Sequence, residues 1–146
     1  MAKDLLDLPF ITSGISSLAT RNLLRGQSFM LPSGENLAFT MGRPESEIDT
    51  VSDHANSLLA NKLHNCTPLW FYLLAEAEVI GRETKFGTFD AGEGLGPVGA
   101  QIVAEVIIGL MELDPRSFLS TARDWTPKKD GLGDNVRTVG DILTFS

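Results

Sequence analysis

The sequence lacks several features that would point directly to a function. It holds a single cysteine, Cys66, and only two histidines, His54 and His64, among its 146 residues. One cysteine cannot form an internal disulfide, which indicates a reducing compartment, and we expect a partly buried structural thiol. Positive charge is also scarce, because 12 Lys and Arg stand against 19 Asp and Glu. The resulting net charge of −7 argues against nucleic acid or an anionic membrane as partners.

Long hydrophobic runs are missing as well. A membrane-spanning helix needs about 20 mostly apolar residues. The most apolar stretch, residues 97–113, is shorter and carries Glu105 and Glu112. The first residues supply only a few leucines before Pro9, so no secretory hydrophobic region is present there. We therefore expect a cytoplasmic protein without a membrane span.

Strand-like alternation of apolar and polar residues is also absent, and the apolar residues recur mostly with helical spacing. For a chain of this length we expect one domain, residues 1–146. Residues 82–94 have no regular period and are expected to form a loop. The fold class is therefore mainly α, with about five helices joined by loops rich in Gly and Pro. The predicted helices span residues 16–29, 33–41, 45–63, 67–80 and 97–113.

The predicted helix ends rest on local signals. Ser16 or Ser17 is expected to cap the first helix and Ser33 the second. Thr67 followed by Pro68 is typical of a hydroxyl cap and a proline at the first helical position. The helix over residues 97–113 is nearly encircled by apolar side chains, which predicts a core helix.

The most informative residues lie on the first predicted helix, in the segment Arg21-Asn22-Leu23-Leu24-Arg25-Gly26. Asn22 and Arg25 are three residues apart, so on a helix they point to nearly the same side. An amide and a fixed cation then share one patch, with apolar neighbours such as Leu18. This pair suits a bound group that is apolar in the middle and anionic at its edge.

The order of the motifs along the chain resembles the C-terminal part of the animal-type haem peroxidases, and most closely their bacterial branch. The resemblance extends from about Asp7 to Phe145. The motifs that carry it are Arg21-Asn22-Leu23-Leu24-Arg25-Gly26, Leu31-Pro32-Ser33-Gly34, Thr67-Pro68-Leu69-Trp70-Phe71-Tyr72, Leu95-Gly96-Pro97-Val98-Gly99, Trp125-Thr126-Pro127 and Val139-Gly140-Asp141-Ile142-Leu143.

The resemblance implies peroxide-driven oxidation at a b-type haem, in a peroxidase or a related dioxygenase, and a role in the response to oxidative stress. It gives Asn22 the role of accepting a hydrogen bond from the iron-ligating imidazole, and Arg25 that of pairing with a haem propionate. Both roles suit the side chains: such an acceptor orients a ligating imidazole, and an Arg fork pairs well with a carboxylate. The Arg-Asp-His portion that follows the Arg in animal members is absent from residues 26–32.

The family's proximal and distal histidine regions would lie N-terminal to this segment, and complete catalytic domains are several times longer. We therefore expect a C-terminal portion that carries no catalytic residue, is inactive alone, and binds haem b only together with the missing part. The resemblance then implies a fragment, a truncated gene product, or one piece of a split protein in which a companion chain supplies the rest. The alternative is a small acidic helical interaction module without catalysis, which would use exposed apolar surface around Trp70, Phe71 and the last long helix.

Two other patterns in the sequence do not indicate a binding site. Residues 94–99 satisfy the G-x-G-x-x-G dinucleotide motif, but the strand that must precede it is not evident. His54 lies beside Asp53 on a polar helix, which is typical of a solvated face, and His64 lies near a helix end. Either histidine could ligate a metal in principle, but neither belongs to a recognisable ligand set.

Overall fold

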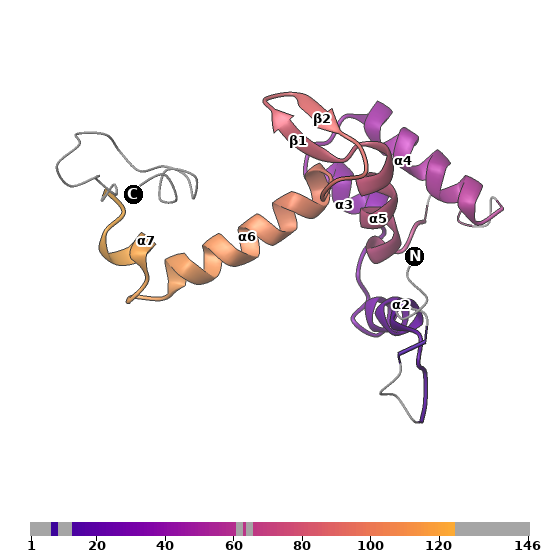
Figure 1. Ribbon diagram of the computed structural model, residues 1–146, viewed down its shortest axis with the longest axis horizontal. Coiled ribbons are helices and arrows are strands. Elements are labelled where there is room, and N and C mark those ends of the chain that lie inside the picture. Colours follow the sequence, from indigo (N-terminus) through magenta and orange to yellow (C-terminus); the bar gives the residue numbers. More distant parts are fainter. Residues whose placement is uncertain (1–6, 9–12, 61–62, 64–65, 125–146) are drawn as a thin grey trace, which may run out of the picture. The chain divides into compact units, whose positions relative to one another are not determined.

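The structure of the protein is a computed structural model that describes residues 7–8, 13–60, 63 and 66–124 (Figure 1). The described part is mainly helical, as the sequence predicts. The chain divides into two compact units, Met1–Ala104 and Glu105–Ser146. The elements in chain order are α2 (Leu18–Ser28), α3 (Gly34–Thr40), α4 (Glu45–Leu58), α5 (Leu69–Val79), β1 (Arg82–Lys85), β2 (Thr88–Asp90), α6 (Pro97–Leu113) and α7 (Phe118–Thr121).

The first two described helices begin at serine caps. The Ser17 hydroxyl accepts a hydrogen bond from the backbone N–H of Thr20, at 3.2 Å. The Ser33 hydroxyl accepts from the backbone N–H of Asn36, at 3.3 Å. Each bond satisfies a donor that the first helical turn leaves free. Both predicted caps are confirmed, and α2 ends within a residue of the expected position.

Helices α3, α4 and α5 pack together and form the core of the first unit (Figure 1). Tyr72 is the largest fully buried side chain, and it lies directly against Gly34. A Cβ atom at Gly34 would stand 2.0 Å from Cγ of Tyr72, so only glycine fits there. Seven buried hydrophobic residues make up the core, namely Ala38, Ile48, Val51, Ala55, Tyr72, Ala75 and Val98.

A buried carboxylate joins three parts of this core. Glu35, on α3, accepts a hydrogen bond from the Ser52 hydroxyl of α4 at 2.9 Å. It also accepts from Thr67, through the backbone N–H at 3.0 Å and through the hydroxyl at 2.6 Å. The predicted hydroxyl cap at Thr67 is therefore wrong. Pro68 is the cap residue of α5 and makes no side-chain cap bond, since proline has no side-chain acceptor, and the Thr67 hydroxyl donates to Glu35 instead.

The predicted loop over residues 82–94 is a second correction. Strands β1 and β2 pair antiparallel, with Arg82 opposite Asp90 and a bulge between Glu83 and Lys85. All four residues of β1 are exposed, so neither face of the strand required an apolar pattern. The hairpin therefore left no period-two signal in the sequence.

The C-terminal end of α5 is tied to the start of α6 by a second buried carboxylate. Glu76 accepts hydrogen bonds from the backbone N–H groups of Val98, at 3.1 Å, and Gly99, at 3.2 Å. These donors belong to the first turn of α6, where a negative charge is favoured. Desolvation by burial is nevertheless the largest effect, and it raises the pKa of Glu76 above its ordinary value.

Helix α6 begins and ends at the predicted residues, but it is not the core helix that its composition predicts. Only Val98 and Gly99 of this helix are buried. Farther along, Val106 is 56% exposed and Leu110 is 64% exposed. In the part of the chain that the structure describes, no helix is long and apolar enough to cross a membrane.

Candidate functional site

The candidate site lies along one edge of α2. Asn22 and Arg25, the pair selected from the sequence, line the same hollow, which has a volume of about 740 Å³. We refer to it as the Arg25 hollow. Asn22 is half-buried and Arg25 is exposed. The three-residue spacing therefore has the geometric consequence that the sequence predicts. The hollow is lined by Leu8, Leu18, Arg21, Asn22, Leu24, Arg25, Ser28 and Phe29.

Two cations with no acidic partner among the described residues give the Arg25 hollow its charge. Arg21 and Arg25 both line it, and no Asp or Glu does. The ion pairs found among the described residues involve Arg43, Arg82 and Arg123 but neither of these two arginines. A carboxylate or phosphate entering the hollow would therefore meet a guanidinium fork that no described acidic residue occupies.

The rest of the lining is apolar and comes from two turns of α2 and the residues beside it. Leu18 and Leu24 stand on the helix, and Phe29 follows its last residue. Phe29 is 66% exposed, which leaves a large aromatic surface without cover in the described structure. The arrangement fits a ligand with an apolar body and an anionic rim. The spacing of residues in the sequence could not show that Leu8 and Phe29 line this hollow.

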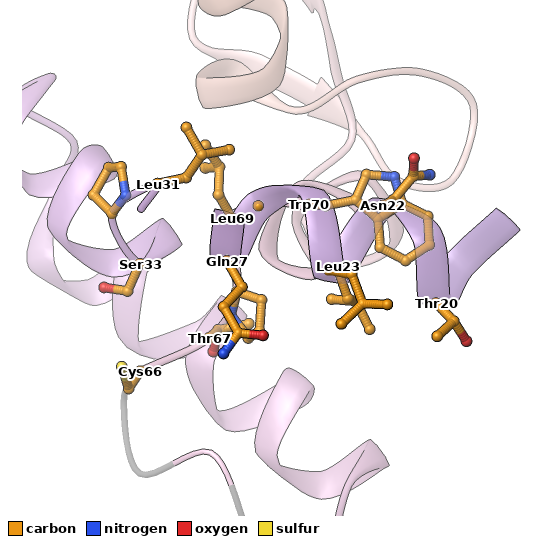
Figure 2. A pocket seen from close by; sticks show the side chains of 14 residues that line it. Thr20, Asn22, Leu23, Gln27, Leu31, Ser33, Cys66, Thr67, Leu69 and Trp70 are labelled. Carbon is orange, nitrogen blue, oxygen red and sulfur yellow. The ribbon is translucent and has the colours of Figure 1, made fainter. Parts of the chain in front are cut away.

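A second hollow, of about 470 Å³, lies between α2 and the residues leading into α5 (Figure 2). We refer to it as the Cys66 hollow. It shares Asn22 and Leu24 with the Arg25 hollow but neither arginine. Its lining consists of Thr20, Asn22, Leu23, Leu24, Gly26, Gln27, Leu31, Pro32, Ser33, Cys66, Thr67, Pro68, Leu69 and Trp70.

Cys66 itself departs from expectation. The thiol is free and exposed rather than partly buried, and it forms part of the wall of the hollow that carries its name. The composition of the sequence could not reveal this, because cysteine is one of the residues most often buried. Its accessibility makes it a usable chemical reporter for this hollow.

The histidines contribute nothing to either hollow among the described residues. His54 is half-buried, and its Nε2 lies 3.0 Å from the Glu78 carboxylate of α5. The prediction of a purely solvated His54 is therefore wrong, since this side chain joins two helices. His64 lies outside the described residues. Among the described residues, no group of three or more His, Cys, Asp or Glu could hold a metal ion.

At the glycine motif of residues 94–99, the Glu76 side chain fills the place where a phosphate would bind. The first-turn N–H groups that would cradle a phosphate in a dinucleotide site donate to Glu76 instead. A Cβ at Gly96 would stand 2.3 Å from Cγ of Glu76, so this glycine is needed for the close approach of that side chain. The structure thus gives a packing explanation for the motif.

Sequence reasoning missed the two buried carboxylates, Glu35 and Glu76. Their partners lie far away in sequence: Glu35 binds Thr67, and Glu76 binds Val98 and Gly99. The available signal was indirect. A glutamate among apolar residues of α5 and a glycine-rich entry to α6 are both consistent with a carboxylate bonded to a helix N-terminus.

No family model, curated protein or solved structure matches this chain.

Proposed function

We propose that this chain is the C-terminal portion of an animal-type haem peroxidase, and that the Arg25 hollow receives the propionate edge of a haem b. The observation that carries the proposal is the placement of Asn22 and Arg25 in one apolar-walled hollow. The order of the sequence motifs, which resembles that of these peroxidases, indicates the family. An unpaired Arg suits a propionate, and leucine and phenylalanine side chains suit the porphyrin face.

The residues of the hollow fit one part of a haem site. Arg25 would pair with a propionate, and the Asn22 side chain would accept a hydrogen bond from an iron-ligating imidazole. No histidine lines the hollow among the described residues, so the ligating imidazole would come from another stretch of polypeptide. A bound haem would supply the redox chemistry with peroxide. This chain would orient the imidazole and neutralise the propionate.

The first consequence is that the chain alone neither cleaves peroxide nor binds haem tightly. A guaiacol oxidation assay with haemin and hydrogen peroxide tests this, with haemin alone as the reference. We expect the chain to leave the rate close to that of haemin alone, because the groups that activate peroxide lie elsewhere. A rate well above free haemin would contradict the inactive-alone proposal.

The role of Asn22 is testable by supplying the absent imidazole in solution. Haemin is titrated into the chain with imidazole, whose second ring N–H can donate to Asn22, or with 1-methylimidazole, which lacks that N–H. We expect Asn22→Leu to weaken haemin binding about twofold to tenfold with imidazole, the range of a net hydrogen bond. With 1-methylimidazole the substitution should have much less effect. Equal losses of haemin affinity with imidazole and with 1-methylimidazole would contradict the proposed acceptor role of Asn22.

The second candidate function is a non-catalytic interaction module. The observation that favours it is exposed apolar surface on α6, where Val103, Ile107 and Leu110 are between 45% and 64% exposed. Size-exclusion chromatography with light scattering separates the two readings. A monomer that melts cooperatively favours the module, whereas aggregation of the isolated chain favours a portion of a larger domain.

A further inference from the structure

The Cys66 hollow has the size and construction of a small-molecule site. Its volume of about 470 Å³ falls within the range of ordinary ligand pockets, about 300–1,000 Å³. One wall is the flank of α2 that carries Leu23 and Gln27, and the other is the entry to α5 with Leu69 and Trp70 (Figure 2). Both walls belong to the first unit of the chain.

Backbone hydrogen bonds hold the walls in place without a ligand. The N–H of Gly34 donates to the carbonyl of Thr67 at 2.9 Å, which ties the segment after α2 to the segment before α5. The N–H of Leu31 donates to the carbonyl of Gly26 at 3.0 Å and fixes the turn that leaves α2. Glu35 holds Thr67 from the buried side. A preformed pocket of this kind loses little conformational entropy on binding.

The lining chemistry selects an uncharged ligand. Among the described residues that line the hollow, none is Asp, Glu, Lys, Arg or His. A charged group entering it would lose hydration without gaining an opposite charge. The apolar part of the lining includes an indole ring, Trp70, on which an aromatic ring can stack.

Two primary amides provide the hydrogen-bonding capacity. Asn22 and Gln27 line the hollow, and neither side chain is bonded to another described residue. Each amide can donate and accept, so a single hydroxyl, amine or carbonyl on the ligand would find a partner.

We propose that the Cys66 hollow binds a small neutral aromatic molecule carrying one hydrogen-bonding group, stacked near Trp70 and bonded to the amide of Gln27 or Asn22. This site shares Asn22 and Leu24 with the Arg25 hollow but neither of its arginines, and it does not depend on haem. It uses the flank of α2 that carries Leu23 and Gln27, whereas the arginines line the other hollow.

The test uses a pair of probes that differ in charge. N-phenyl-1-naphthylamine is neutral and carries one N–H, and 1-anilinonaphthalene-8-sulfonate has the same aromatic frame with a sulfonate added. We expect the neutral probe to bind with a stoichiometry of one per chain. We expect the sulfonate to bind about tenfold or more weakly, because its charge has no partner in the lining.

Cys66 reports whether the probe sits in this hollow rather than elsewhere on the protein. It is the only cysteine of the chain, and it is exposed, so iodoacetamide alkylates one site. With the neutral probe at ten times its Kd, we expect the alkylation rate to fall by about tenfold, the fraction of empty sites. An unchanged alkylation rate at saturating probe would overturn the proposal.

Leu→Trp substitutions inside and outside the lining compare a filled hollow with an open one. Leu23→Trp and Leu31→Trp each place an indole in the lining, and both should abolish probe binding and the protection of Cys66. Leu58→Trp makes the same change at an exposed position outside the lining and should preserve both. Circular dichroism checks that each variant folds, and two filling variants guard against the failure of one.

The outcomes separate this site from the haem proposal. Retained binding and protection in a folded filling variant would refute the Cys66 hollow, whatever haemin does. Loss of probe binding in Leu58→Trp would show that the probe binds elsewhere and would also refute it. Arg25→Gln, which alters only the Arg25 hollow, should leave probe affinity unchanged.

Discussion

The polar side chains around Glu35 and those along the edge of α2 differ in whether they have bonding partners among the described residues. In the core, Glu35 accepts bonds from Ser52 and Thr67, and within the described residues no buried side-chain N or O atom lacks a partner. Along α2 no residue is buried, and Arg25 has no ion pair with a described residue. Polar groups in the core therefore stabilise the fold, whereas Arg21 and Arg25 on α2 have no ion pair with a described residue.

The substitution Glu35→Ala is the sharpest test of whether hydrogen bonds in the core stabilise the fold. It leaves the Thr67 N–H, the Thr67 hydroxyl and the Ser52 hydroxyl without their acceptor. We expect a loss of about 3 kcal/mol in the free energy of unfolding, measured by urea denaturation, because buried unpaired donors are costly. Asp53→Ala is the matched control, since that carboxylate is exposed on α4. Equal losses for the two variants would contradict the role of Glu35.

The next largest effect is expected at Gly34. Gly34→Ala forces a methyl group into the position held by the Tyr72 ring, and we expect it to destabilise the core by about 1–3 kcal/mol. Gly109→Ala on α6 is the matched control, because a Cβ there meets nothing within 4 Å. A thermal melt should show a lower melting temperature for Gly34→Ala and an unchanged or higher melting temperature for Gly109→Ala. A stable Gly34→Ala protein would show that this contact is loose.

A smaller, pH-dependent effect is expected at Glu76. Burial raises the pKa of Glu76 in the folded chain, so the folded state binds this proton more tightly than the unfolded state does. The contribution to stability is therefore fully present below the unfolded pKa and is lost as pH rises through the folded pKa. Relative to Glu76→Gln, which does not titrate, the native chain should gain unfolding free energy as pH falls from neutral into the acidic range. A flat difference across that range would contradict the expectation.

The smallest effect on stability should come from the α2 edge itself. Gln27→Ala and Arg25→Gln remove exposed groups that have no bond to a described residue. We expect each to change the free energy of unfolding by less than about 0.5 kcal/mol, as is typical of surface positions. Chemical denaturation measures this directly. A large loss at either position would mean that the edge supports the fold and would weaken the contrast drawn above.

The helices could be predicted because their signals are local. Ser17 and Ser33 cap the helices that follow them, and Pro97 is the first residue of α6. The prediction of a hydroxyl cap at Thr67 was wrong for the opposite reason. Its hydroxyl has a local cap signal, yet its partner is Glu35, 32 residues away in the sequence. Hairpin β1–β2 was missed because its exposed strand β1 needs no apolar face.

The candidate site was predictable in part. The spacing of Asn22 and Arg25 placed them on one side of α2, and both line one hollow. The walls of both hollows depend on other segments, such as Phe29 beyond the helix and Trp70 on α5. Periodicity within one helix carries no information on which other segment will face it, so these walls required the structure.

Arg25 is proposed to neutralise a haem propionate, and one binding comparison tests this role most directly. Haemin and its dimethyl ester, in which both propionates are uncharged, are titrated in the presence of imidazole into the native chain, Arg25→Gln and the charge-matched control Arg116→Gln. We predict that Arg25→Gln weakens haemin binding about twofold to fivefold, the range of an exposed ion pair, and leaves the ester and the control unaffected. Equal affinities of the native chain and Arg25→Gln for haemin would contradict the claim.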